Sequence, residues 1–245
     1  MTPRRLDHVL LLAGLLALWQ LVHWAVGPDV VSSPWATIVR AGELLESAAF
    51  WGHARATATA FALASIIAIA AGVSFGTWLG LRRFAGDVAD PILGTLYSIP
   101  KITLYPLILL VFGLGVSAKV AFGVIHGVFP IAIFTMSAIR NVAPVFRRTA
   151  LIMRLGPFAT ASTVMAPAAL PEILAGIRIG VALTLLGTLI GELFASTSGL
   201  GFALIRAMDV HAVADILAIT MLIFIFAASV NAVLGFVERR ARHGG

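Results

Sequence analysis

Six long apolar segments constrain this sequence more than any other feature. An α-helix rises about 1.5 Å per residue, so about 20 apolar residues cross a hydrocarbon core of about 30 Å. We place segments of about this length at 9–26, 56–81, 92–113, 116–139, 173–195 and 213–237. The sequence therefore predicts an all-α membrane protein, with six transmembrane helices in a single domain covering residues 1–245.

Composition excludes several other classes of protein. Hydrophobic residues make up 60% of the chain and charged residues only 11%, whereas soluble domains carry about 25% charged residues. The chain contains no cysteine, which excludes disulfide scaffolds, thiolate metal sites and cysteine nucleophiles. The formal net charge of +6 would suit nucleic-acid binding, but the positions of the basic residues give another explanation.

The basic residues lie mostly on one side of the predicted membrane. With the N-terminus inside, the inner segments hold Arg4, Arg5, Arg82, Arg83, Arg140, Arg147, Arg148, Arg154, Arg239, Arg240 and Arg242. The outer segments hold Arg40, Arg55, Lys119 and Arg206. This 11 to 4 division follows the positive-inside rule. We expect a multi-pass protein of the bacterial inner (plasma) membrane with both termini in the cytoplasm and no nucleic-acid partner.

The first apolar segment has an alternative reading as a signal peptide, because Arg4 and Arg5 precede it. Its 18-residue apolar core is long for a signal peptide, and no A-x-A cleavage site follows. We therefore expect a retained span. Its removal would leave the other five spans in the same orientation. Between the first two segments, Ser33 and Pro34 predict the start of a short outer interfacial helix.

Small residues recur at every fourth position of the second segment. The stripe consists of Ala60, Ala64, Ala68, Gly72, Gly76 and Gly80. The fifth segment repeats the pattern with Gly176, Gly180, Gly187 and Gly191. Such stripes let two helix backbones approach closely. We predict close helix packing here, with a sliding or hinging interface as the functional alternative.

The third segment, IPKITLYPLILLVFGLG, places two prolines and a lysine inside the predicted span. Pro100 and Pro106 remove backbone donors that protein or water must replace. A charge at this depth is costly and usually faces a cavity or a partner. Lys101, with Tyr97 and Tyr105 beside it, is therefore a candidate pathway residue for anions. The alternative is that Lys101 snorkels or pairs with a carboxylate.

Glu192, in IGELFASTSGLG near the outer end of the fifth segment, is an intramembrane acid. Gly199 and Gly201 follow it and permit a tight turn. Glu192 is a candidate gate residue, and the alternatives are a buried structural pair or exposure at the outer surface. His126 is a further pathway candidate. Single histidines and amides such as His23, His126 and Asn231 more often form interhelical hydrogen bonds.

Several catalytic motifs are absent from the sequence. It contains no G-x-x-x-x-G-K-[ST] nucleotide loop, no H-E-x-x-H zinc motif and no G-x-S-x-G nucleophile elbow. We therefore expect no catalytic residue, no metal site and no cofactor bound by this chain. A pump of this kind needs energy from a partner or from an ion gradient.

Motifs along nearly the whole chain resemble the permease family that serves nitrate, sulfonate, taurine and similar ABC importers. They are VSSPWATIVRAGELL, IPKITLYPLILLVFGLGVSAKV, PAALPEILAGIRIG, IGELFASTSGLG and FVERR, in this order. The resemblance implies a type I (MetI-like) permease bundle. It also implies alternating access, in which two identical permease chains enclose a pathway for a small, anionic solute.

The resemblance also implies the partners. A periplasmic binding protein would deliver the solute, and two cytoplasmic subunits would bind ATP and magnesium. The cytoplasmic segment 140–172 would contain a short coupling helix that docks on the ATPase. The implied coupling residues are Arg148, Arg154, Leu155, Gly156, Phe158, Pro167, Leu170 and Pro171. The sequence departs from the family pattern before Gly156, where Ala150, Leu151 and Ile152 replace the usual Glu-Ala-Ala.

Two other functional classes, a secondary transporter and a membrane enzyme, fit the sequence less well. A secondary transporter driven by an ion gradient would need intramembrane acids or unwound helices near the midplane. The prolines of the third segment fit that class, and the shortage of acids does not. A membrane enzyme would need one of the catalytic motifs that the sequence lacks.

Overall fold

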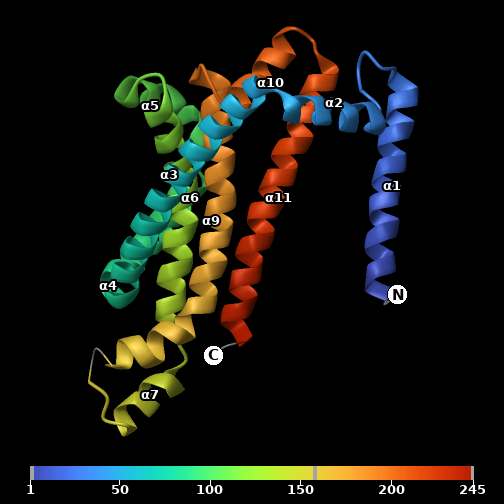
Figure 1. Cartoon of the computed structure of the whole chain (residues 1–245). Helices are drawn as coiled ribbons and strands as arrows, with labels where there is room; N and C mark the ends of the chain where they lie inside the picture. Colours follow the sequence, from blue (N-terminus) through green and yellow to red (C-terminus); the bar gives the residue numbers. More distant parts are fainter. Residues whose placement is uncertain (1–2, 157–158, 244–245) are drawn as a thin grey trace.

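The computed structural model describes residues 3–156 and 159–243, and this part of the chain is helical without strands. The elements are α1 (Pro3–Val26), α2 (Pro34–Glu46), α3 (Ala48–Leu81), α4 (Arg83–Ser98), η1 (Lys101–Leu104), α5 (Tyr105–Phe112), α6 (Val116–Arg140), α7 (Pro144–Ile152), η2 (Thr160–Met165), α9 (Ala166–Ala195), α10 (Leu200–Asp209) and α11 (Val213–His243). Five of them, α1, α3, α6, α9 and α11, are long and apolar enough to cross a membrane. The bent pair of α4 with η1 and α5 makes a sixth if it is counted as one span. The molecule is thus an all-α bundle of membrane-spanning length (Figure 1).

Helix α6 is the centre of the bundle and packs against α3 on one side and α9 on the other (Figure 1). A Cβ atom added at Gly76 of α3 would lie 2.5 Å from the carbonyl oxygen of Ala132. One added at Gly180 of α9 would lie 2.8 Å from the carbonyl oxygen of Gly127. The small residues therefore bring three backbones into contact, which in lipid supplies the van der Waals packing that holds helices together.

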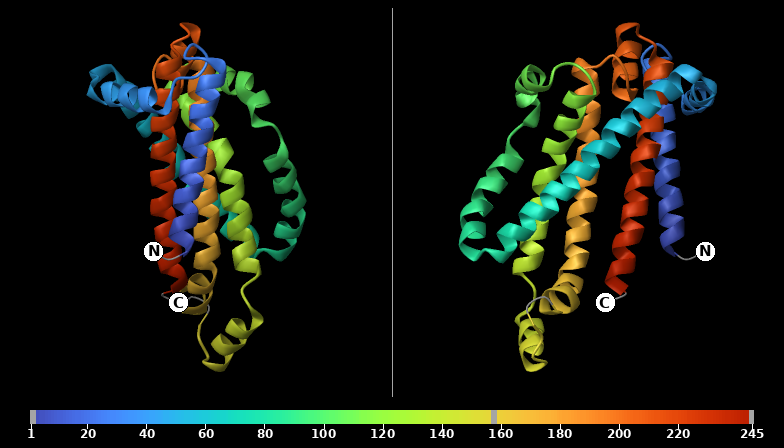
Figure 2. Two further views of the ribbon diagram at one scale, coloured as in Figure 1. Left: turned by 90° about the vertical axis from the view of Figure 1, so that its right-hand side faces the viewer. Right: turned by 60° about the vertical axis from the view of Figure 1, so that its left-hand side comes forward.

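The stripe on α3 faces α6 in this arrangement. Ala60, Ala64 and Ala68 are fully buried, and a Cβ at Gly72 would lie 2.7 Å from the Cβ of Ile131. With 34 residues, α3 is about 51 Å long. It crosses the bundle obliquely (Figure 2), as expected for a helix longer than the hydrocarbon core.

The third apolar segment is broken, which corrects the expectation of one helix over 92–113. Helix α4 begins at Arg83 and ends at Ser98, and the chain bends by 85° before it continues through η1 and α5. Pro100 explains the break, because it lacks an N–H and holds Ile99 in an extended conformation. At its other end, α4 is tied to α6 by an ion pair between Asp87 and Arg140.

Helix α2 lies across the end of the bundle that the basic residues predict to be the outer end (Figure 1). The Ser33 side chain caps the N-terminus of α2 by accepting from the Ala36 N–H at 3.2 Å. Arg40 of α2 donates to Asp215 of α11 and to Glu43. These hydrogen bonds, that to Asp215 first, raise the pKa of Arg40 above its ordinary value. The ion pair joins the first connection of the chain to its last helix.

Helix α1 stands apart from the bundle (Figure 1). No residue of its apolar stretch Val9–Val26 is buried. Instead of the interhelical bond expected of it, His23 places Nδ1 2.6 Å from the carbonyl oxygen of Val31, in the following loop. The Trp19 indole likewise donates to the carbonyl of Ser32 at 3.0 Å. These bonds fix how α1 leads into α2.

The segment predicted as an inner loop over 140–172 is mostly helical. Helix α7 occupies its first half, and η2 and the start of α9 occupy its second half. Helix α7 projects beyond the ends of α6 and α9, on the side where α1 begins and α11 ends (Figure 1). Pro167 and Pro171 lie within α9 and do not end a loop, which corrects their expected place.

Candidate functional site

A buried ion pair joins α6 to α9 at the outer end of the bundle. The side chains of Lys119 and Glu192 are 1% and 0% exposed, and Lys119 Nζ lies 3.5 Å from Glu192 Oε1. Lys119 Nζ also donates to the carbonyl oxygen of Ser198 at 2.5 Å. Lys119 therefore does not face the outer surface, which corrects its placement among the outer basic residues.

Glu192 has further partners on two other elements. The hydroxyl of Thr57, on α3, lies 2.8 Å from Oε2 and 3.0 Å from Oε1. The N–H of Gly201, at the start of α10, donates to Oε2 at 3.0 Å. Of the alternatives for Glu192, the structure shows a carboxylate buried and paired inside the chain, with no outer exposure.

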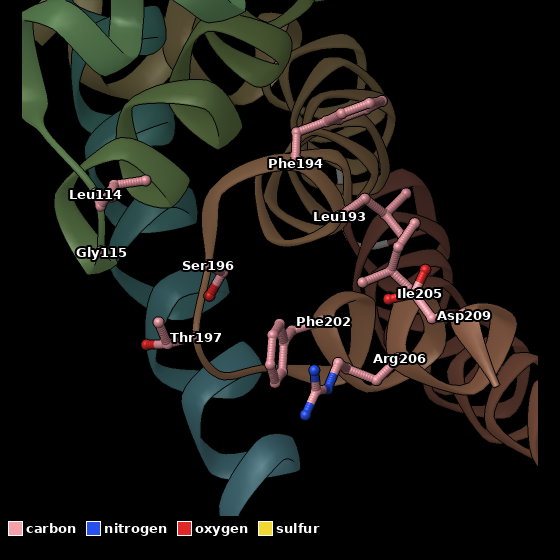
Figure 3. Close-up of a pocket in the computed structure, with 10 residues that line it drawn as sticks. All are labelled: Leu114, Gly115, Leu193, Phe194, Ser196, Thr197, Phe202, Ile205, Arg206 and Asp209. Atoms are coloured by element: carbon pink, nitrogen blue, oxygen red, sulfur yellow. The ribbon is translucent and has the colours of Figure 1, made fainter.

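A pocket of about 510 Å³ lies at the same end of the bundle (Figure 3). Its lining comes from the α5–α6 turn, the end of α9, the loop that follows and α10: Leu114, Gly115, Leu193, Phe194, Ser196, Thr197, Phe202, Ile205, Arg206 and Asp209. The Arg206 guanidinium lies 5.7 Å from the centre of the Phe202 ring. The pocket thus presents a cation, a carboxylate and aromatic walls together.

Lys101 lies at the break between α4 and α5, in the short helix η1. Its Nζ donates to the carbonyl oxygen of Tyr97 at 2.7 Å and lies 5.0 Å and 5.9 Å from the rings of Tyr97 and Phe129. Among the described residues, no carboxylate oxygen lies within 4.0 Å of Lys101 Nζ. The Lys101 side chain is thus held by a carbonyl and two ring faces.

Tyr105 and His126 are packed inside the bundle. The Tyr105 hydroxyl donates to the carbonyl of Gly191 at 3.4 Å, and its ring lies edge-on to Phe122. His126 places Nδ1 2.8 Å from the Phe122 carbonyl oxygen, and its ring fills the space that a Cβ at Gly187 would occupy. Both residues contact α9 and hold the helices together, whereas Tyr97 is exposed.

Arg178 is a charged residue of α9 that sequence reasoning passed over. Its Nε donates to Asn231 Oδ1 at 2.7 Å, and its Nη1 lies 3.3 Å from Glu238 Oε2, both on α11. Arg178 and Tyr97 line one cavity of about 460 Å³. The signal was present, because Arg178 is an arginine inside the predicted span 173–195.

Lys119, Thr57 and His53 were also missed as members of the outer cluster. Lys119 lies inside the predicted span 116–139, close to its outer start, and Glu192 lies close to the outer end of the next span. A basic and an acidic residue at the same depth indicate a pair. Thr57 and His53 carried no such signal, since a threonine and a histidine near a helix start are common.

The predicted coupling residues divide among several elements. Arg148 is exposed on α7, and Arg154 has a positive φ of 51° in the turn after it. Among the residues that the structure describes, none lies within 4 Å of a Cβ added at Gly156. Leu170 belongs to α9 with Pro167 and Pro171, while Leu155 lies in the turn and Phe158 is outside the described residues.

One face of α7 consists of exposed apolar residues. Leu151 and Ile152 are 76% and 82% exposed, and Val145, Phe146 and Met153 are exposed as well. The helix begins at Pro144 and ends at Ile152, inside the segment 140–172 in which a coupling helix was expected. Ala150, one of the residues that depart from the family pattern, is the buried position of α7.

Several permease proteins of transport systems resemble this chain. Residues 68–243 match the family described as binding-protein-dependent transport system inner membrane component. The aliphatic sulfonates transport permease protein SsuC of Bacillus subtilis is 29% identical over 201 residues, 81% of this chain and 73% of that protein. The taurine transport system permease protein TauC of Escherichia coli is 29% identical over 95% of this chain and 89% of its own length. The nitrate import permease protein NrtB of Leptolyngbya laminosa is 25% identical over 92% and 84%.

The family match and the helices agree on one architecture. The matched residues run from the second half of α3 to the end of α11 and include all of α6 and α9. The family is one of permeases and not of enzymes. The chain belongs to the binding-protein-dependent transport system inner membrane components, and is the membrane-spanning permease subunit of an ABC importer.

Proposed function

We propose that this permease forms the translocation pathway for a small anionic solute, in a complex with a second copy of the chain. Two cytoplasmic subunits would bind ATP and magnesium, and a periplasmic binding protein would deliver the solute. The ends of α1 and α11 near α7 would face the cytoplasm, which agrees with the division of the basic residues.

The exposed apolar face of α7 is the observation that supports this function best. Leu151 and Ile152 would meet water at the inner side of the membrane, beyond the ends of the spanning helices. Exposed apolar patches of this kind mark sites of protein interaction. A groove on an ATPase subunit would cover the face, and Arg148 beside it would meet acidic groups at the rim.

The packing of the bundle supports transport by rigid motion. Helices α3, α6 and α9 are joined through glycine contacts and would move as one body. The broken segment of α4, η1 and α5 lies outside this body and carries Lys101 at its bend. Broken helices of this kind line solute sites in transporters.

The proposed substrate class rests on charge. The named relatives carry aliphatic sulfonates, taurine and nitrate, which are anions or carry an anionic group. Lys101 and Arg178 place two cations at the bend and beside the cavity that Tyr97 lines. Arg178 is balanced by Glu238, so Lys101 is the group that would attract an anion.

Reconstitution tests this function directly. The permease is placed in proteoliposomes with its ATPase subunits and binding protein, and uptake of the ligand that stabilises the binding protein in a thermal-shift screen is measured. We expect uptake to require both ATP and the binding protein. Uptake driven by an ion gradient without ATP would contradict the proposal.

A further inference from the structure

The N-terminus of α10 is held by side chains from other helices. In most helices the first N–H groups are capped by a local side chain or by water. Here three successive N–H groups, those of Gly199, Leu200 and Gly201, donate to His53 Nδ1 at 3.2 Å, Thr57 Oγ1 at 2.7 Å and Glu192 Oε2 at 3.0 Å. Helix α10 is therefore capped by α3 and α9.

Glu192 connects the Thr57 and Gly201 parts of this cap. The Thr57 hydroxyl oxygen accepts a hydrogen bond from the Leu200 N–H, and the same hydroxyl donates its hydrogen to the Glu192 carboxylate. The two hydrogen bonds are therefore compatible. A carboxylate at a helix N-terminus is also favoured by the helix dipole. Lys119 adds the fourth element, because its Nζ reaches both Glu192 and the carbonyl of Ser198.

The glycines of this turn leave room for the carboxylate. Gly199 has a φ of +120°, and a Cβ there would lie 2.1 Å from Glu192 Cδ. A Cβ at Gly201 would lie 2.7 Å from the Cβ of Glu192. The backbone of the turn thus lies directly on the Glu192 side chain, so the position of one sets the position of the other.

The same turn forms a wall of the outer pocket. Ser196 and Thr197 line the pocket (Figure 3). Within the turn, the Ser196 hydroxyl donates to the carbonyl oxygen of Ser198. Phe202 and Arg206 of α10 line it as well. Because polar bonds to a few buried groups hold this wall, loss of one group frees the turn and α10 together.

We propose that Glu192 is a positioning residue of the transport cycle, which ties the outer turn 196–199 and α10 to α3, α6 and α9. The outer end then opens and closes with the rigid bundle, and motion at α7 reaches the outer pocket through α9. This proposal rests on the proposed transport function for its role, and on the buried contacts for its geometry.

The absence of cysteine from the chain makes the anchoring measurable. Thr197→Cys places a single thiol on the exposed turn, and its rate of reaction with a membrane-impermeant maleimide is measured in the assembled complex. Glu192→Gln should raise that rate by about tenfold, within the range of coupling between linked sites. Glu46→Gln, which removes a carboxylate from the exposed surface of α2, is the matched control and should leave the rate unchanged.

A second variant keeps the test decisive if Glu192→Gln does not fold, since it leaves Lys119 buried without its partner. Thr57→Val removes the bridging hydroxyl at nearly constant shape and keeps the ion pair, and should raise the labelling rate in the same direction. Unchanged labelling in a folded Glu192→Gln protein, or in Thr57→Val if Glu192→Gln does not fold, would overturn the anchoring.

Transport supplies the readout that a purely structural role would not change. We expect Glu192→Gln to keep the ATP hydrolysis of the complex while uptake per ATP falls by about tenfold. Equal losses of hydrolysis and uptake, in proportion to the folded protein, would reduce Glu192 to a fold residue. A native complex that takes up nothing with ATP would instead refute the proposed function, while the labelling rates would still decide the anchoring.

Discussion

Charged residues inside this chain are held in two ways. Lys119 and Glu192 are buried against each other, and Arg178 is bonded to Asn231 and Glu238. Lys101 is held by the Tyr97 carbonyl and two rings. A paired charge serves mainly to join helices, whereas a cation on ring faces remains able to attract an anion.

Replacement of Lys101 by Met tests its role. We expect Lys101→Met to raise the KM for the anionic solute by about tenfold, because an attraction worth about 1.4 kcal/mol is lost. Lys101→Arg, which keeps the charge, is the matched control and should retain most of the uptake. Unchanged kinetics in Lys101→Met would assign Lys101 to the fold alone.

Single residues were the least predictable part of the molecule. Glu192 was found because an acid inside an apolar segment is conspicuous, but its choice among three environments depends on tertiary contacts. Lys119 was assigned to the outer surface because it lies close to the outer end of the predicted span 116–139. Its burial follows from Glu192 and from the Ser198 carbonyl, which lie 73 and 79 residues along the chain.

Among the helices, α6 is approached closely by the backbones of its neighbours α3 and α9. Its contacts with α3 and α9 are made where one side lacks a side chain beyond Cα, as at Gly76 and Gly180. Packing of this kind leaves no space for an added methyl group, because backbone atoms cannot move aside as a flexible side chain can.

Gly76→Ala should therefore destabilise the bundle by about 1–3 kcal/mol, as overpacking of a close-packed interior does. The new Cβ would meet the Ala132 carbonyl oxygen at 2.5 Å. Gly52→Ala on the same helix has open space around its Cβ and should be neutral or slightly stabilising. Thermal unfolding in detergent compares the two. Equal melting temperatures would contradict the close contact of α3 with α6.

Gly156→Asp, beyond the end of α7, should uncouple transport from the ATPase without harming the fold. None of the described residues comes within 4 Å of a Cβ added at Gly156, so the added carboxylate would act on a docked partner. We expect normal membrane insertion and melting temperature, with uptake lost. Gly42→Asp, at an equally open position on α2, controls for the added charge. Normal uptake by Gly156→Asp would place the docking surface elsewhere.

The elements divide into those that the sequence predicts and those that it does not. Apolar length and the small-residue stripes are local properties, so the long helices α3, α6 and α9 were expected close to where they lie. The 85° bend after α4 was not, because Pro100 indicates a break but not its angle. The helical start of α9 through Pro167 and Pro171 was also missed, since the family resemblance implied that both prolines lie at the end of the inner loop.

On the scale of the whole molecule, α9 links the two ends. It begins beside α7 and η2 at the inner end and carries Glu192 at the outer end (Figure 2). Helix α1 stands outside this core and contacts α2. The molecule is thus a central three-helix body with α7 projecting at one end and a pocket at the other.

The orientation of this body is testable with single cysteines. In intact cells a membrane-impermeant maleimide should label Thr197→Cys on the outer turn and should not label Met153→Cys after α7. Both residues are exposed in the chain, so a difference reports the side of the membrane. Permeabilised cells should show both labelled. Labelling of Met153→Cys from outside would reverse the orientation that the arginine distribution predicts.

Affinity purification tests the central claim, that this permease works through a separate ATPase docked on α7. The native chain is purified from its membrane, and co-purified cytosolic ATPase is quantified alongside a Leu151→Asp variant, which places a charge on the exposed face of α7. We predict a stoichiometric ATPase with the native chain and its loss from the folded variant. Recovery of a transport-competent protein with no ATPase bound would contradict the account.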